Sequence, residues 1–208
     1  MKKARFITLE GSEGAGKTTA LNVIKAILDQ WNINYICTRE PGGEPIAEKI
    51  RDILLNSQHL HAKTELLLMF AARNEHIENV IKPALTQGIW VISDRFVDAS
   101  YAYQGGGREL GFDAIKWLDD FIVADIQADL TLLLDIEPEI GLKRIKTRGA
   151  TDRIEQEGLD FFKKITQSYR SKAQLNPEKY AIIDASKSIN EVEKEIISAF
   201  NQHKSQLI

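Results

Sequence analysis

The chain has 208 residues, a net charge of −3 and 43% hydrophobic residues. This size and composition are ordinary for a single globular domain. Without an overall basic field, we expect no nucleic-acid partner and no membrane, although local basic clusters can still bind phosphates. No stretch approaches the roughly 18 apolar residues of a spanning helix, and the N-terminal apolar run is too short for a signal peptide, so a soluble cytoplasmic protein is expected. The single cysteine, Cys37, excludes an internal disulfide and is expected in the core.

Short apolar runs alternate with helical patterns along the chain, which indicates βαβ units and a parallel sheet. We therefore predict one α/β domain over residues 1–208, with a five-stranded parallel sheet flanked by helices. Strands are expected at residues 4–9, 34–38, 89–93, 130–134 and 180–183. Helices are expected after residue 18, at residues 45–55 and 62–86, and from residue 189 onward.

Residues 11–18 read GSEGAGKT and match the pattern G-x4-G-K-[ST] between an expected strand and an expected helix. Glycines there let backbone N–H groups approach phosphate oxygens, and the following helix adds a favourable dipole. We expect Lys17 to reach the β- and γ-phosphates of a nucleoside triphosphate and Thr18 to offer a hydroxyl to Mg²⁺. A glycine turn without a ligand is the alternative. The predicted nucleotide-binding residues are Gly11, Ser12, Glu13, Gly14, Ala15, Gly16, Lys17 and Thr18.

The apolar run at residues 89–93 ends in Asp94 and Arg95. An acidic residue at the carboxyl end of a buried strand is well placed to hold Mg²⁺ beside the phosphate loop. Arg95 would then put a positive charge between two sets of phosphates. The alternative is that Asp94 and Arg95 only end the strand and pair with each other. The chain shows no base-reading Asn-Lys-x-Asp element and is short for a motor, so a small phosphotransferase fits best.

Six motifs follow one another between residues 11 and 155: GSEGAGKT, TREPGG, FAARNEH, SDRF, AYQGGGR and RGATDRIE. Together they resemble the bacterial thymidylate kinases over nearly the whole chain. The resemblance implies a P-loop NTPase fold, transfer of phosphate from ATP to dTMP with Mg²⁺ in dTTP synthesis, and a homodimer formed through helices. Two alternatives stay open: a kinase for another nucleoside monophosphate or a deoxynucleoside, and a non-catalytic nucleotide-binding regulatory module.

Two helical stripes are candidates for the acceptor site. Phe70 and Arg73 share one helix face, and Ser100, Tyr103 and Gln104 share another. The resemblance implies that Phe70 stacks on thymine, that Arg73 contacts its O4, and that Tyr103 crowds the ribose 2′ position. Gln104 can read a pyrimidine amide edge because its side chain both donates and accepts. The alternative is a structural helix followed by a flexible glycine run.

Two further residues are assigned to the acceptor phosphate. The resemblance implies that Arg51 contacts this phosphate with Arg95 nearby, and that Glu40 lies near the phosphate and the waters of Mg²⁺. A guanidinium suits phosphate because its planar fork donates two hydrogen bonds together. Taken alone, Arg51 could equally lie on a solvated helix face, and Glu40 could be a turn carboxylate.

The phosphate loop carries no cation at its variable positions, so further positive charge must come from elsewhere. Arg144 and Arg148 lie one turn apart on an expected helix that Gly149 would end, and Arg153 follows. We predict a short lid over about residues 144–156 that brings Arg148 and Arg153 to the transition state and excludes water. The alternative is a basic surface helix. The predicted catalytic residues are Lys17, Arg95, Arg148 and Arg153.

Overall fold

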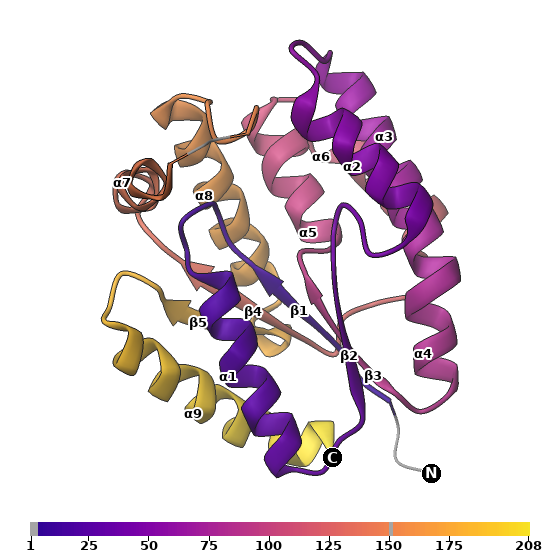
Figure 1. The fold of residues 1–208 in the computed structure, drawn as a ribbon, viewed down its shortest axis with the longest axis vertical. Coiled ribbons are helices and arrows are strands. Elements are labelled where there is room, and N and C mark those ends of the chain that lie inside the picture. The colour runs from indigo at the N-terminus through magenta and orange to yellow at the C-terminus, as the bar shows by residue number, and fades with distance from the viewer. Residues whose placement is uncertain (1–3, 150–151) are drawn as a thin grey trace.

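The computed structural model describes residues 4–149 and 152–208, without the side chain of Arg148. In these ranges the chain forms an α/β domain around a five-stranded parallel sheet with strand order β2-β3-β1-β4-β5 (Figure 1). The strands are β1 (Phe6–Glu10), β2 (Tyr35–Arg39), β3 (Trp90–Asp94), β4 (Leu130–Asp135) and β5 (Tyr180–Asp184).

Helices connect the strands and cover both faces of the sheet. The α-helices are α1 (Lys17–Gln30), α2 (Pro45–Asn56), α3 (Ala62–His76), α4 (Lys82–Thr86), α5 (Val97–Ser100), α6 (Phe112–Leu118), α7 (Pro138–Arg148), α8 (Leu159–Leu175) and α9 (Ile189–Leu207). Three segments are π-helical, namely η1 (Ile77–Ile81), η2 (Tyr101–Gly107) and η3 (Asp119–Val123), and η4 (Pro177–Lys179) is a 3₁₀ turn.

The central strand β1 is buried along its whole length, as expected when helices cover both faces of a parallel sheet. Its alternate side chains enter different core clusters. Ile7 and Leu9 pack with α1 and α9, whereas Phe6 packs with α3, η1 and α6 on the other face. A third cluster joins η2 to α8, where Tyr103 meets Phe161 and Phe162. Side chains of β1 therefore anchor α1 and α9 on one face of the sheet and α3, η1 and α6 on the other.

The expected strands and helices are confirmed, with boundaries that differ by a few residues. The helical pattern at residues 62–86 forms α3, η1 and α4 in succession, and its π-helical middle was not predicted. The expectation that Cys37 lies in the core is wrong, because its side chain is exposed. The reason is that β2 is an edge strand, and all of its residues are only partly buried or exposed.

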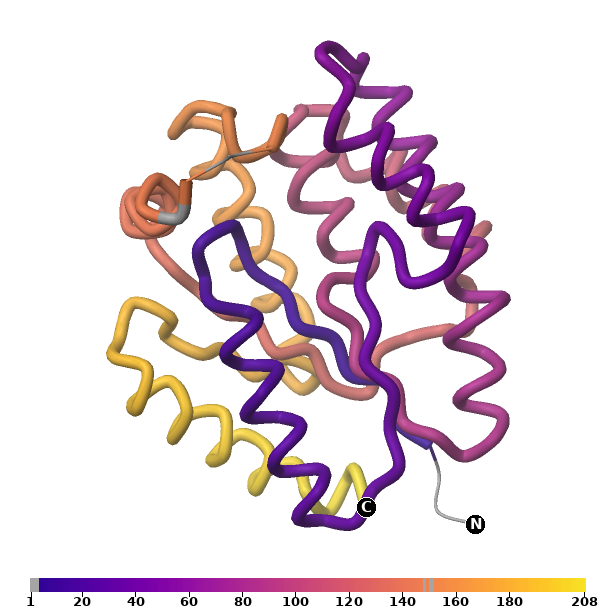
Figure 2. Tube along the Cα trace, in the orientation of Figure 1, coloured from indigo at the N-terminus to yellow at the C-terminus, as the bar shows by residue number. Residues whose placement is uncertain are grey.

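The loops that follow β1, β2 and β3 converge at the carboxyl edge of the sheet. In the strand register, Asp94 at the end of β3 lies beside Leu9 of β1 and Arg39 of β2, so the following loops emerge together. Figure 2 shows that the loops after β1 and β2 rise on the same side of the sheet. Ligands of open α/β sheets bind at this edge. Within the described ranges, no helix is long and apolar enough to cross a membrane.

Candidate active site

A cavity of about 440 Å³ opens at the carboxyl edge of the sheet. It is lined by the loop between β1 and α1, the loop after β2, and parts of α2, α3, β3, η2, α7 and the segment after α7. Of the residues predicted from sequence, the lining includes Glu13, Gly14, Gly16, Lys17, Thr18, Glu40, Arg51, Asp94, Arg95, Tyr103, Gln104 and Arg153. Thus most of the predicted groups come together around one space.

The phosphate loop is held close to α7. Gly14 adopts a φ of +76°, and a side chain there would place its Cβ 2.4 Å from the carbonyl oxygen of Gly141. Lys17 Nζ donates to the carbonyl oxygens of Gly11 (3.2 Å) and Ser12 (3.4 Å). Burial and the positive charge of Arg95 lower the pKa of Lys17 to about 8, against the attraction of nearby carboxylates. A protonated Lys17 therefore lacks sufficient counter-charge here, which favours an anionic ligand.

Arg95 is bound to the phosphate loop by its side chain. Its guanidinium donates to Glu13 Oε1 (2.7 Å) and to the carbonyl oxygen of Gly11 (2.7 Å). Tyr103 Oη donates to the other oxygen of Glu13 at 2.5 Å, and Arg95 Cζ lies 4.9 Å from the Tyr103 ring centroid. The alternative in which Arg95 pairs only with Asp94 is therefore wrong, since Glu13 is its ion-pair partner.

Asp94 presents a carboxylate oxygen that the described residues leave unsatisfied. Its Oδ1 is buried and has no hydrogen-bond partner among them. A buried acceptor without a partner costs about 1–3 kcal/mol, so such an atom is expected to receive a ligand. Thr18, the other predicted metal residue, lines the same cavity. The described residues contain no group of three or more histidine, cysteine or acidic side chains around one point. This donor set fits Mg²⁺, which commonly combines one or two protein groups with substrate phosphates.

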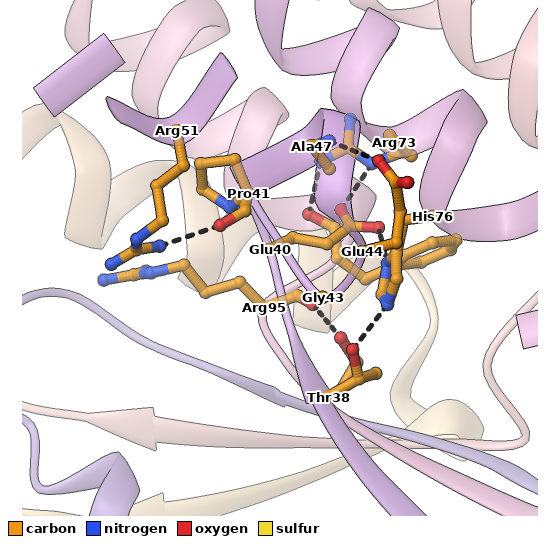
Figure 3. Close-up of polar contacts among 12 residues, drawn as sticks. Thr38, Glu40, Pro41, Gly43, Glu44, Ala47, Arg51, Arg73, His76 and Arg95 are labelled. Atoms are coloured by element: carbon orange, nitrogen blue, oxygen red, sulfur yellow. Dashed lines mark hydrogen bonds and ion pairs between the residues drawn. The ribbon is translucent and has the colours of Figure 1, made fainter. Parts of the chain in front are cut away.

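Glu40 belongs to a buried ion-pair network that the sequence did not predict (Figure 3). Its Oε2 accepts from Arg73 Nε at 2.7 Å, and its Oε1 lies 2.9 Å from His76 Nδ1. His76 Nε2 in turn lies 2.6 Å from Thr38 Oγ1. Both carboxylate oxygens are thus engaged, so Glu40 is more than a turn carboxylate. The FAARNEH motif could have indicated part of this network, because Arg73 and His76 lie three residues apart and share one face of α3.

Phe70 and Arg73 share a face of α3, as their spacing predicted, and Ser100 lies against Arg73, but these three residues do not line the cavity. Arg73 Nη1 donates to Ser100 Oγ at 3.0 Å and Nη2 donates to the carbonyl oxygen of Phe96 at 3.0 Å. Its Cζ lies 4.6 Å from the Phe70 ring centroid. These three side chains are almost completely buried. Their contact with an acceptor base stays a prediction.

Arg51 lines the cavity from α2 and is not a fully solvated surface residue. Its Nη1 donates to the carbonyl oxygen of Pro41 at 2.8 Å (Figure 3). Burial and the nearby positive charge of Arg39 lower the pKa of Arg51. With Lys17 and Arg95 on other walls, the cavity collects cationic groups from several elements. Such a space is suited to a ligand with more than one phosphate.

Gln104 lines the cavity beside Glu65, a residue that was not predicted from the sequence. Gln104 Nε2 donates to Glu65 Oε1 at 2.8 Å, while Gln104 Oε1 is buried and has no partner among the described residues. Glu65 is only 1% exposed. It lies four residues before Met69 and eight before Arg73 on α3, so this stripe of helix positions could have identified it.

The helix before the predicted lid ends as expected. α7 stops at Arg148, and Gly149 follows with a φ of +107°. Arg144 Nη1 donates to the carbonyl oxygens of Gly14 (3.2 Å) and Ala185 (2.9 Å). The Arg148 side chain lies outside the described part of the chain. Arg153 Nη2 lies 2.7 Å from Glu65 Oε2, so this lid residue contacts α3.

Comparisons with known proteins agree with this geometry. The family model described as thymidylate kinase matches residues 9–196. A thymidylate kinase of Ruthia magnifica subsp. Calyptogena magnifica is 48% identical over 198 residues, which cover 94% of this chain and 97% of the relative. One from Hahella chejuensis is also 48% identical, with 94% and 95% covered. One from Methylobacillus flagellatus is 42% identical over 203 residues, with 98% and 100% covered.

Proposed function

The chain belongs to the thymidylate kinase family, and we propose that it phosphorylates dTMP to dTDP with ATP as the donor, in dTTP synthesis. The observation that carries this proposal is one cavity that joins the phosphate loop to Arg51, Arg95 and Gln104. A donor triphosphate at Lys17 and an acceptor phosphate between Arg51 and Arg95 would then face each other. We further propose that the reaction takes place in the cytoplasm, where ATP is available.

The proposed reaction is a direct in-line transfer. An oxygen of the dTMP phosphate attacks the γ-phosphorus while the bond to the bridging oxygen breaks, and ADP leaves. No general base is required, because the attacking oxygen is already anionic near neutral pH. Lys17 and Arg95 hold the two phosphates together against their repulsion. Thr18 and Asp94 would hold Mg²⁺, which neutralises part of the negative charge when bound.

We propose that the acceptor base meets Gln104, whose buried Oε1 has no partner among the described residues. The N3–H of thymine is a suitable donor to this oxygen. Phe70 and Arg73 remain proposed base contacts for stacking and for O4. The hydrogen bonds of Arg73 to Glu40, Ser100 and Phe96 use three of its five N–H donors, so a contact with O4 is chemically compatible. Tyr103 is proposed to crowd the ribose 2′ position.

We propose that Arg148 and Arg153 supply positive charge when the segment at about residues 144–156 closes over the substrates. The support is the position of Arg153 on the cavity wall and the absence of a cation at the variable positions of the phosphate loop. Closure would also exclude water, which otherwise competes for the γ-phosphoryl group.

A homodimer is part of the proposal. Large apolar side chains remain exposed on α3 and on the α6–η3 segment, namely Leu67 (60% exposed), Trp117 (65%) and Phe121 (72%). Trp117 and Phe121 stack with ring centroids 5.4 Å apart, and η3 packs against α3. A patch of exposed aromatic and aliphatic side chains is typical of a protein interface. We call Leu67, Trp117 and Phe121 the α3–α6 patch.

The test is ADP release by the purified protein with Mg²⁺ and ATP, across dTMP, dUMP, UMP, dCMP, AMP, GMP and thymidine. The proposal expects dTMP to give the highest kcat/KM. A clear preference for another monophosphate would support kinase activity but reject dTMP as the preferred acceptor. ATP binding without ADP release for every acceptor would favour the non-catalytic regulatory module instead.

A further inference from the structure

Glu65 is a buried carboxylate in the first turn of α3 that receives hydrogen bonds from three side chains. Gln104 Nε2 donates to Oε1 at 2.8 Å, and Arg153 Nη2 donates to Oε2 at 2.7 Å. Arg108 donates to both oxygens, from Nε at 3.3 Å and from Nη2 at 3.2 Å. The donors come from η2, from the residue that follows it and from the lid segment, so Glu65 joins the acceptor site to the lid.

The ionised state of Glu65 determines the orientation of the Gln104 amide. Burial alone raises the pKa of Glu65, but hydrogen bonds from Gln104 and Arg153 and the charge of Arg108 lower the pKa below its ordinary value. An ionised carboxylate accepts hydrogen bonds and donates none. The side-chain NH₂ group of Gln104 must therefore face Glu65. Its carbonyl oxygen, Oε1, must point away from Glu65.

This orientation leaves the Gln104 carbonyl oxygen as the group that a ligand meets. That oxygen is buried and without a partner among the described residues, and Gln104 lines the cavity. Thymine and uracil carry an N3–H that donates to such an oxygen. Cytosine carries an unprotonated N3, which is itself an acceptor. Two acceptors in contact in a buried site leave both without a hydrogen bond, which is strongly unfavourable.

We propose that Glu65 is a specificity-determining positioning residue, which fixes the Gln104 amide so that the enzyme accepts pyrimidines with an N3–H and rejects cytosine. The proposal rests on the proposed function, because it assigns the acceptor base to Gln104. Without a neighbouring carboxylate, the amide of Gln104 could rotate and offer its NH₂ group to cytosine N3. Discrimination between bases would then be lost even though Gln104 itself is unchanged.

The test is the substitution Glu65→Gln, which preserves shape but both accepts and donates. We expect the ratio of kcat/KM for dTMP to that for dCMP to fall by roughly tenfold or more, mainly through a lower KM for dCMP. Weaker binding of Arg153 lowers turnover with both acceptors, and this effect cancels in the ratio. The ratio of dTMP to dUMP should stay within about threefold of wild type, because both bases carry the N3–H.

Two variants separate amide orientation from a merely structural role. Glu65→Asp keeps a group that only accepts and should restore most of the discrimination against dCMP. Arg108→Lys keeps the positive charge beside Glu65 but removes the guanidinium that donates to both of its oxygens, so its ratio of dTMP to dCMP should match wild type. An unchanged ratio in Glu65→Gln, or an equal loss in Arg108→Lys, would overturn the inference. A wild-type protein that phosphorylates none of these acceptors would instead reject the proposed function.

Discussion

Glu10 is a residue with an unusual environment, because it is a fully buried carboxyl at the end of β1. The Phe96 N–H donates to its Oε1 at 2.7 Å and Tyr169 Oη donates to its Oε2 at 2.8 Å. Burial and the negative charge of Asp98 raise the pKa of Glu10 from 4.5 to about 8. Both donors lie next to Arg95. Phe96 follows it in the chain, and Tyr169 Oη accepts a hydrogen bond from Arg95 Nη1 at 3.4 Å. Glu10 therefore supports the loop that carries Arg95.

The raised pKa makes stability depend on pH. Between about pH 4.5 and 8 the folded state keeps the Glu10 proton that the unfolded state releases, so this group lowers the stability of the fold as pH rises. Glu10→Gln is neutral throughout and lacks this loss. We expect the Tm of Glu10→Gln minus that of wild type to increase by about 7–14 °C between pH 5 and 8. Thermal denaturation monitored by circular dichroism measures the difference, and a constant difference would contradict the prediction.

Tyr103 offers a second prediction for a single residue. Its ring is fixed by the hydrogen bond to Glu13 and by contact with the Arg95 guanidinium. If this ring excludes a ribose 2′-hydroxyl, Tyr103→Phe should keep the preference for dUMP over UMP, whereas Tyr103→Ala should reduce it roughly tenfold. The two acceptors differ only in the 2′-hydroxyl, so the ratio of their kcat/KM values isolates this effect. A preference that persists in Tyr103→Ala would show that another group excludes the ribose.

At the scale of elements, the π-helix η2 depends on glycine for its packing against α8. A methyl group on Gly106 would place its Cβ 2.0 Å from Ser168 Oγ and 3.1 Å from the Lys164 carbonyl oxygen. Gly106→Ala should therefore destabilise the protein by about 1–3 kcal/mol and lower Tm by about 3–10 °C. It should also raise the KM for dTMP, because Tyr103 and Gln104 belong to the same element.

Two controls accompany this substitution. Gly158 has open space around its Cβ position and a φ of −77°, so Gly158→Ala should cost less than about 1 kcal/mol. Adding Ser168→Ala to Gly106→Ala removes the nearest clashing atom and should recover part of the lost Tm. A Tm for Gly106→Ala equal to wild type would mean that η2 and α8 separate without cost.

The strands and most of the long helices were predictable because their patterns are strong over whole segments, but α8 was not predicted. Apolar runs indicated buried strands, and the glycine-rich motif identified the phosphate loop before α1. The π-helical geometry of η2 was not predictable, since helical spacing alone does not distinguish an i+5 from an i+4 hydrogen bond. The glycine run in η2, which could also have indicated flexibility, instead permits close packing against α6 and α8.

At the scale of the whole molecule, parallel topology brings together groups that are distant in sequence. The family resemblance implied that Lys17, Arg51, Arg95 and Gln104 share a site, and all four line one cavity. Shared helix faces could not show which side chains are on the cavity wall, so Arg73 was expected in the open site but is buried behind it. Glu65 was missed because its partners, Gln104 and Arg153, are distant in sequence and meet it only in the folded chain.

The exposed α3–α6 patch leads to a prediction about the oligomeric state of the protein in solution. If the proposed homodimer forms, the wild-type protein should have twice the mass of one chain in solution, because Leu67, Trp117 and Phe121 would bury exposed apolar surface against a second copy. Phe121→Glu would place a charge in that interface and should yield monomers, as should Leu67→Glu. Ile189→Glu is the matched control, because Ile189 is 68% exposed on α9, across the sheet from α3 (Figure 1). Light scattering coupled to size-exclusion chromatography measures each mass. Dimers that persist in both α3–α6 patch variants would place the interface elsewhere, and a monomeric wild type would reject the homodimer.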